Sequence, residues 1–174
     1  MPPATSRIDA RSHAGDGISI AHNLVVQYGC GMHAARLDEQ LCFALYSASR
    51  AVTAAYRPLL DELGITYPQY LVLLVLWEDQ DCSVGHLGHR LHLDSGTLSP
   101  LLKRLESGGL AIRRRAADDE RRVEVSLTPA GRALEARAAC IPERLLMSAN
   151  ATEGDIAALR DVLRGLVDQL DSAQ

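Results

Sequence analysis

Apolar residues recur every three or four positions along most of this chain, which is the spacing of amphipathic helices. The first such segment begins at Leu37. Pro58 predicts a kink or an end at Arg57, because the residue before a proline disfavours helical backbone angles. A short helix, Leu59 to Leu63, should follow and stop at Gly64, a residue type that suits a helix C-terminus.

The next segment predicts the buried centre of the domain. A helix over about residues 67–79 should follow Thr66 as its N-cap, with Pro68 near its first turn. Its run from Tyr70 to Trp77 is apolar almost all round, which is typical of a helix enclosed by other elements. Ser83 begins a third helix that continues through Leu91.

A fourth helix and two β-prone segments come next. The helix is capped by Asp94 or Ser95 and runs to about Ser107, where two glycines end it. Residues 110–114 and 123–127 predict strands, and the second alternates apolar and polar positions as a half-buried strand does. Because a hairpin then follows a helix–turn–helix, the expected fold class is mainly α with a small β-hairpin wing, a winged helix-turn-helix.

Two more helices complete the pattern. One follows Thr128-Pro129 and runs into the alanine-rich stretch near Cys140, and the other covers roughly residues 152–170. The first helix and these last two have apolar faces that a winged helix alone does not use. A second copy of the chain is the simplest partner for such faces, so we expect a homodimer formed by the N- and C-terminal helices.

These elements divide the chain into regions. Residues 1–31 are rich in proline, glycine, serine and histidine without a sustained period, so we expect them to be disordered. A start assigned too far upstream and a genuine tail would both account for this leader. Residues 32–174 form the winged-helix domain, with dimerisation segments at 34–63 and 130–172 and the DNA-binding part at 66–127.

Composition narrows the class of protein. Hydrophobic residues make up 47% of the chain and aromatic residues 4%, which favours packed helices over a β-sandwich. Four cysteines without a CxxC pair predict neither a zinc ribbon nor a disulfide scaffold, and the six histidines lack metal-ligand spacing. We expect no metal and no cofactor. No apolar run is long enough for a membrane span and no signal peptide is evident, which predicts a cytoplasmic protein.

The segment 93–106 predicts a DNA-reading helix. Four leucines form one stripe that anchors it, at positions 98, 101, 102 and 105. Small hydroxylic and basic side chains lie off that stripe: Ser95, Thr97, Ser99, Lys103 and Arg104. Hydroxyl groups near the helix start can approach base edges, and the cations behind them can reach phosphates.

Positive charge is concentrated just after this helix. The whole chain has a net charge of -4, yet residues 100–122 hold seven basic and four acidic residues. A solvated charged loop would look the same in isolation, but the position after a helix–turn–helix favours DNA binding. We therefore predict DNA contacts from Arg114, Arg121 and Arg122, with Asp119 bracing Arg121 toward a minor groove.

These residues resemble the multiple-antibiotic-resistance regulator (MarR) family, and within it the organic-hydroperoxide-resistance regulators (OhrR). The resemblance covers about residues 36–132. It rests on four motifs: LCFALYSAS at 41–49, GITYPQYLVLLVLWE at 64–78, LDSGTLSPLLKRLE at 93–106, and Asp119-x-Arg121 before LTPAG at 127–131. Such specific motifs in this order imply a homodimeric repressor that binds a pseudo-palindromic double-stranded operator, and not an enzyme.

The resemblance also implies the sensing residues. Cys42 corresponds to the cysteine whose oxidation by an organic hydroperoxide, the inducer, releases DNA. Tyr56 and Tyr67 fall where the family has tyrosines that support the thiolate, and Cys140 is a candidate resolving partner. Without the resemblance, all four residues would be read as packing.

The residues themselves constrain this chemistry. A helix N-terminus near Cys42 favours the thiolate by roughly 0.3–1 kcal/mol, while Asp38 and Glu39 oppose it. Cys42 and Tyr56 are 14 residues apart, about 21 Å along a continuous helix. Either the chain folds back sharply or the tyrosines come from the partner subunit, which the resemblance favours. Phe43, Leu45 and residues 71–76 would provide an apolar wall for an alkyl hydroperoxide.

Two other functions remain open at this point. A MarR-type repressor relieved by a reversible small phenolic ligand would need Cys42 only as a structural residue. A thiol peroxidase would turn over peroxide and ignore DNA, and the basic wing argues against it.

Overall fold

The computed structural model describes residues 36–116, 122–149 and 151–173. The chain divides into two compact units, Met1–Phe43 and Ala44–Gln174, and each is described by itself. The elements in chain order are η1 (Leu37–Glu39), α2 (Leu41–Asp61), α3 (Tyr67–Asp79), β1 (Cys82–Ser83), α4 (Val84–Leu91), α5 (Ser95–Ser107), β2 (Ala111–Arg115), β3 (Val123–Leu127), α6 (Pro129–Ala138), α7 (Ile141–Ala149) and α8 (Glu153–Asp171). Leader residues 1–31 lie outside the described part.

Helix α2 differs from the prediction at both ends. Leu37 begins a 3-10 turn, and the α-helix starts only at Leu41. At the other end the helix continues through Pro58 to Asp61 and absorbs the predicted separate helix. A proline inside a helix costs roughly 3 kcal/mol. Tertiary contacts offset that cost here, because Leu60 in the following turn is only 1% exposed and packs in the core.

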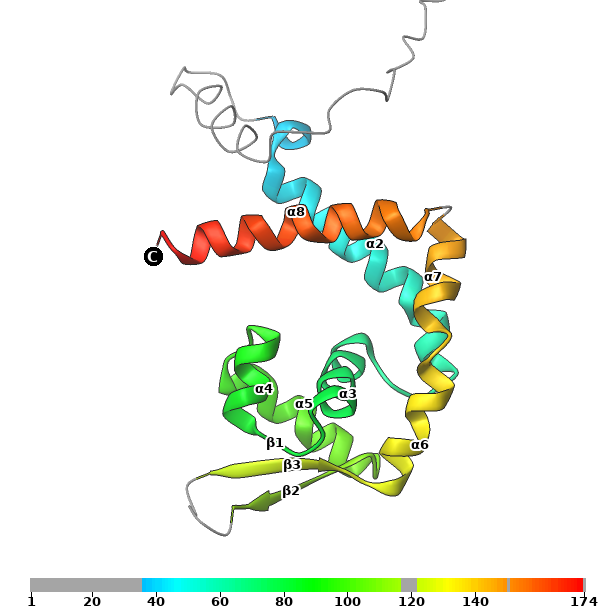
Figure 1. Cartoon of the computed structure of the whole chain (residues 1–174), viewed down its shortest axis with the longest axis vertical. Helices are drawn as coiled ribbons and strands as arrows, with labels where there is room; N and C mark the ends of the chain where they lie inside the picture. Colours follow the sequence, from blue (N-terminus) through cyan, green and yellow to red (C-terminus); the bar gives the residue numbers. More distant parts are fainter. Residues whose placement is uncertain (1–35, 117–121, 150, 174) are drawn as a thin grey trace, which may run out of the picture. The chain divides into compact units, whose positions relative to one another are not determined.

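The predicted central helix is confirmed as the core of the domain. In α3, Val72, Leu73 and Leu76 are each fully buried. The leucine stripe of α5 packs against them in the same hydrophobic cluster, together with Leu87 of α4. A helix that is apolar all round must be enclosed on every side. Figure 1 shows α3 with α4, α5 and α6 around it.

The wing has one strand more than predicted. Strands β2 and β3 pair antiparallel, with Ala111 opposite Leu127, and β1 adds to the free edge of β3 with Cys82 opposite Val125. Figure 1 shows this sheet packed along one side of the helix–turn–helix. This additional strand is two residues long, too short for alternation of apolar and polar positions to reveal it, and its Cys82 is buried. The fold is the expected winged helix-turn-helix.

The helix after the wing is broken near Cys140. Helix α6 ends at Ala138, Cys140 lies in a turn, and α7 restarts at Ile141. Pro142 explains the break, because its ring excludes a helical bond to the carbonyl four residues earlier, that of Ala138, but suits the first turn of a new helix. The prediction that placed Cys140 inside an alanine-rich helix is therefore wrong. None of the described helices combines the length and apolar character that crossing a bilayer requires.

Candidate functional site

Helix α5 presents the predicted face to solvent. Its N-cap Asp94 accepts a hydrogen bond from the Thr97 backbone N–H at 2.8 Å, and this bond and that from the Thr97 hydroxyl lower the pKa of Asp94. The leucine stripe is buried, so the other side of the helix is exposed. That exposed side carries Ser95, Thr97, Ser99, Lys103 and Arg104, as predicted.

Two of the predicted base-reading hydroxyls donate their protons within the helix. The Thr97 Oγ1 donates to Asp94 Oδ2 at 2.9 Å, and Ser99 Oγ donates to the Ser95 carbonyl at 2.7 Å. Each oxygen keeps free lone pairs, so both side chains present acceptors outward. Acceptors in the major groove match the exposed amino groups of adenine and cytosine.

The arginines of the wing differ in whether a carboxylate neutralises their charge. Arg113 in β2 donates to the Glu106 carboxylate from Nε at 2.8 Å and lies 2.6 Å from it through NH2, which lowers the pKa of Glu106. Arg114, its neighbour on the strand, is exposed and has no charged partner within the described ranges. Arg122 is exposed and lies 3.3 Å from Glu124. The predicted pair Asp119 and Arg121 falls outside the described residues.

A hydrogen-bond chain that the sequence did not reveal holds the base of the wing. Thr128 Oγ1 donates to the Gly109 carbonyl at 2.6 Å and accepts from the Gly131 N–H at 3.0 Å. The Trp77 indole N–H then donates to the Gly131 carbonyl at 2.9 Å. The start of α6 thereby connects the turn after α5 to the central helix. The cap signal of Thr128 was visible in the sequence, but its partners were not.

The structure brings Tyr56 and Tyr67 together, with ring centroids 4.9 Å apart, and adds Tyr70 at 5.9 Å from Tyr56. Burial raises the pKa of all three phenols, that of Tyr70 to about 12. These hydroxyl groups therefore stay protonated at neutral pH and can donate hydrogen bonds. Sequence reasoning missed Tyr70 because it lies within an uninterrupted apolar run.

The described cysteines fall into two classes. Cys42 is a free, exposed thiol in the first turn of α2, closer to a helix N-terminus than predicted. Cys140 is also free and exposed, and its thiol contacts the Arg137 carbonyl at 3.9 Å. Cys82 is buried, and burial raises the pKa of its thiol to about 11, so it stays protonated. Cys30 lies outside the described part of the chain.

The expected apolar wall is largely unavailable to a ligand. Four of the six residues in the 71–76 run are buried in the domain core, and only Leu74 is exposed, at 39%. The physical reason is that α3 is the central helix, so its apolar surface packs against neighbouring elements. Phe43 and Leu45 are both half-buried.

Known proteins resemble this chain over most of its length. A family model described as transcriptional regulator SarA/Rot matches residues 54–137. The organic hydroperoxide resistance transcriptional regulator of Bacillus subtilis is 47% identical over 135 residues, which cover 78% of this chain and 92% of the relative. The transcriptional regulator TtmR of Methylorubrum extorquens is 50% identical, over 77% of this chain and 69% of TtmR.

Among solved structures, the chain is also similar to transcriptional regulators. Reduced AbfR bound to DNA is 36% identical and has a TM-score of 0.64 over 78% of this chain and 94% of AbfR. The disulfide-formed state of AbfR matches with a TM-score of 0.54 at 36% identity, over 79% and 92%. PcaV of Streptomyces coelicolor, solved with its natural ligand, is 25% identical with a TM-score of 0.69, over 79% and 98%. The chain is a transcriptional regulator that belongs to the MarR family of winged-helix proteins and is of the organic hydroperoxide resistance regulator type.

Proposed function

We propose that this protein is a repressor that binds operator DNA as a homodimer and releases it when an organic hydroperoxide oxidises Cys42. The observation that carries the proposal is the free, exposed thiol of Cys42 in the first turn of α2, in a chain 47% identical to an organic hydroperoxide resistance regulator. AbfR, solved both reduced on DNA and in a disulfide form, supports a redox-controlled DNA interaction.

DNA binding is assigned to residues 66–127. The exposed face of α5 would enter the major groove, with Ser95, Thr97 and Ser99 near base edges and Lys103 and Arg104 near phosphates. The wing, with Arg114, Arg121, Arg122 and the bracing Asp119, would contact the adjacent backbone or minor groove. Two copies should place their α5 helices about 34 Å apart, one turn of B-DNA, on a pseudo-palindrome.

A second copy would cover the apolar surface of α2, α7 and α8. Two adjoining grooves of 560 and 530 Å³ run between these helices. Large apolar side chains stay exposed on these three helices: Val52, Met147, Ile156, Leu159, Val162, Val167 and Leu170. Exposed apolar patches of this extent mark interfaces between proteins. We therefore assign segments 34–63 and 130–172 to dimerisation. Light scattering at micromolar concentration should give the mass of two chains.

The sensing step is a nucleophilic displacement. The Cys42 thiolate attacks the peroxide oxygen that is not bonded to carbon, an S–O bond forms, and the O–O bond breaks. The alkoxide takes up a proton and leaves as an alcohol, and Cys42 becomes a sulfenic acid. The Cys140 thiol of the partner subunit then attacks this sulfur and displaces water, which forms a disulfide between the chains. Cys140 would act there as the resolving residue.

Hydrogen bonds from Tyr56 and Tyr67 of the partner subunit would stabilise the thiolate. Tyr56→Phe should therefore keep operator affinity but slow oxidation of Cys42 about tenfold, because a hydrogen bond to a charged group contributes roughly 1.5–3 kcal/mol. The rate can be followed by stopped-flow trapping of the sulfenic acid. Tyr70→Phe is the matched control from the same cluster and should react at the wild-type rate. Equal rates for the wild type, Tyr56→Phe and Tyr70→Phe would remove Tyr56 from the mechanism.

Arg113 is paired with a carboxylate and Arg114 is not, so substituting each of them tests whether the wing contacts DNA. Arg114→Ala should make the slope of the logarithm of the association constant against the logarithm of the salt concentration less negative by about one, because one phosphate contact is lost. Arg113→Ala should leave the slope nearly unchanged, because its guanidinium already neutralises Glu106. Fluorescence anisotropy with labelled operator between 50 and 200 mM salt, roughly, gives both slopes. Identical slopes for the two variants would contradict this assignment of the wing.

The proposed function itself is tested by a gel shift on the DNA upstream of the protein's own gene. The reduced protein should retard this DNA, cumene hydroperoxide should release it, and dithiothreitol should restore binding. Release by a phenolic acid that persists in Cys42→Ser would instead favour a reversible ligand. That alternative is supported by PcaV, a structural neighbour solved with its natural ligand.

A further inference from the structure

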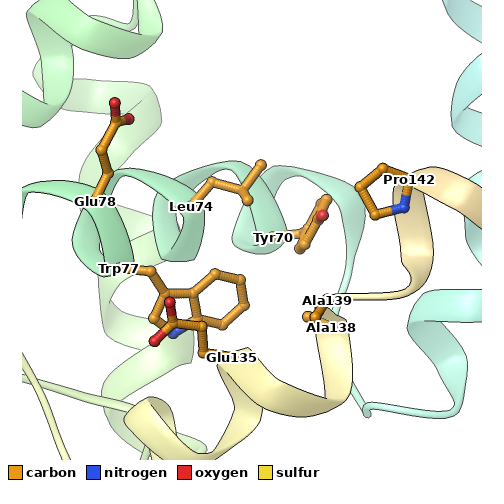
Figure 2. Close-up of a pocket in the computed structure, with 8 residues that line it drawn as sticks. All are labelled: Tyr70, Leu74, Trp77, Glu78, Glu135, Ala138, Ala139 and Pro142. Atoms are coloured by element: carbon orange, nitrogen blue, oxygen red, sulfur yellow. The ribbon is translucent and has the colours of Figure 1, made fainter. Parts of the chain in front are cut away.

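Cys140 lies in the break between α6 and α7, with an arginine on each side of it in the chain. Figure 2, which looks into the pocket beside this break, shows Ala139 on one side of it and Pro142 on the other. The Cys140 thiol is free and exposed, and its sulfur lies 3.9 Å from the Arg137 carbonyl. The Arg144 backbone N–H donates to the Cys140 carbonyl at 3.1 Å, which places these two residues one helical turn apart.

Both arginines bind the same residue, Glu62, in the turn that follows α2. The Glu62 carboxylate accepts hydrogen bonds from Arg144 Nη1 at 3.1 Å and Nη2 at 3.2 Å. The Glu62 backbone carbonyl accepts another from Arg137 Nη2 at 3.0 Å. A bidentate pair fixes the orientation of a guanidinium as well as its position. Because Arg137 and Arg144 flank Cys140, Glu62 clamps the Cys140 turn to the end of α2.

The charges of this cluster are only partly balanced. The Arg144 guanidinium is paired with the Glu62 carboxylate and lowers the pKa of that group. Arg137 meets a carbonyl and, among the described residues, no carboxylate. A hydrogen bond and the charge of Glu62 raise the pKa of Arg144, and the Cys140 thiolate raises it further by its own charge and hydrogen bond. Cations beside a cysteine favour the thiolate, which is the form that attacks another sulfur.

We propose that Arg144 stabilises the Cys140 thiolate for the resolving step, and that Glu62 limits the reactivity of this thiol by holding the Arg144 guanidinium and the Cys140 turn. The inference rests on the proposed role of Cys140 as the resolving residue. In that step the Cys140 thiolate attacks the sulfenic sulfur of the partner's Cys42. The S–S bond forms while the S–O bond breaks, and the hydroxide takes up a proton and leaves as water.

The reactivity of Cys140 is measured on the reduced full-length protein, without peroxide or DNA. Iodoacetamide is a neutral reagent that alkylates thiolates, and mass spectrometry of the Cys140 peptide gives its rate of addition. Glu62→Gln should raise this rate about threefold at neutral pH, because the full charge of Arg144 then acts on the thiolate. Arg144→Gln should lower the rate about threefold, because the cation is lost.

The opposite signs separate this role from a structural one. A pair that only held the α6–α7 turn in place would give the same change whichever partner was lost, since both variants break the same hydrogen bonds. Arg144→Lys keeps the positive charge and should restore most of the rate that Arg144→Gln loses. Asp61→Asn is the matched control and should react at the wild-type rate, because Asp61 is the exposed neighbour of Glu62 and its carboxylate has no partner in the described ranges.

Non-reducing gels then connect this reactivity to the proposed function. After addition of cumene hydroperoxide, Glu62→Gln should form the covalent dimer about threefold faster than wild type, while its Cys42 is oxidised at the wild-type rate. Equal alkylation rates in wild type, Glu62→Gln and Arg144→Gln, or changes of the same sign in both variants, would overturn the proposal. If the alkylation rates are as expected but no variant forms a covalent dimer, the control of the Cys140 thiol is upheld and only its resolving role is lost from the proposed function.

Discussion

Cys42→Ser is expected to bind the operator within about twofold of wild type and to stay bound at peroxide concentrations that fully release the wild-type protein. The side chain is exposed in the first turn of α2, so a serine of similar size fits without repacking. A serine hydroxyl cannot form a sulfenic acid or a disulfide. The predicted loss of response is therefore complete. Anisotropy with labelled operator, with and without cumene hydroperoxide, measures it.

Two further cysteine variants separate the steps. Cys82→Ala should respond to peroxide as wild type does, because the Cys82 thiol is buried and stays protonated. Cys140→Ser should abolish the covalent dimer on non-reducing gels and leave a sulfenic acid, or a mixed disulfide with a small thiol, on Cys42. A Cys42→Ser protein that still leaves the operator on peroxide treatment would remove Cys42 as the sensor.

Gly131→Ala is expected to destabilise the domain by about 3–5 kcal/mol. A Cβ at this position would lie 2.0 Å from the Leu110 carbonyl oxygen and 3.1 Å from Leu127 Cδ2. Because the nearer atom belongs to the backbone, either the Leu110 backbone or α6 must shift. Overpacking of this kind costs about 1–3 kcal/mol. Displacing α6 also breaks the bonds of Gly131 to Trp77 and Thr128, about 0.5–1.5 kcal/mol each. Urea unfolding followed by circular dichroism gives the difference.

Gly154→Ala provides the matched control for this substitution. Gly154 lies in the first turn of α8, and an added Cβ would make only an ordinary contact with Thr152 Oγ1 at 3.7 Å. Because alanine favours helix over glycine, this variant should be as stable as wild type or up to about 1 kcal/mol more stable. A Gly131→Ala protein that unfolds at the wild-type urea midpoint would contradict the packing of α6 against Leu110.

Local signals in the sequence were sufficient to predict the helices α3, α4 and α5 of the winged domain. The bounds of α3, α4 and α5 and the cap at Asp94 follow from apolar period and capping residues, which act within a few positions of the chain. The face of α5 that carries Thr97 and Lys103 follows from the same leucine period. Family membership was equally accessible, because it rests on motifs of consecutive residues.

Tertiary structure decided the features that depend on distant partners. Helix α2 passes Pro58 because Leu60 is buried, and β1 is a strand only because it pairs with β3. Arg113 differs from Arg114 because Glu106, seven positions earlier, reaches it across the α5–β2 turn.

The tyrosine cluster and the hydrogen bond of Trp77 to α6 also arise from packing. Tyr56 meets Tyr67 across the turn between α2 and α3, and the Trp77 indole N–H reaches the Gly131 carbonyl of α6, 54 positions later in the chain. Periodicity and capping describe a segment and its immediate neighbours, whereas these contacts depend on how separate elements pack. The sequence by itself therefore determined the elements and their exposed faces, and only the packing of those elements determined which side chains meet.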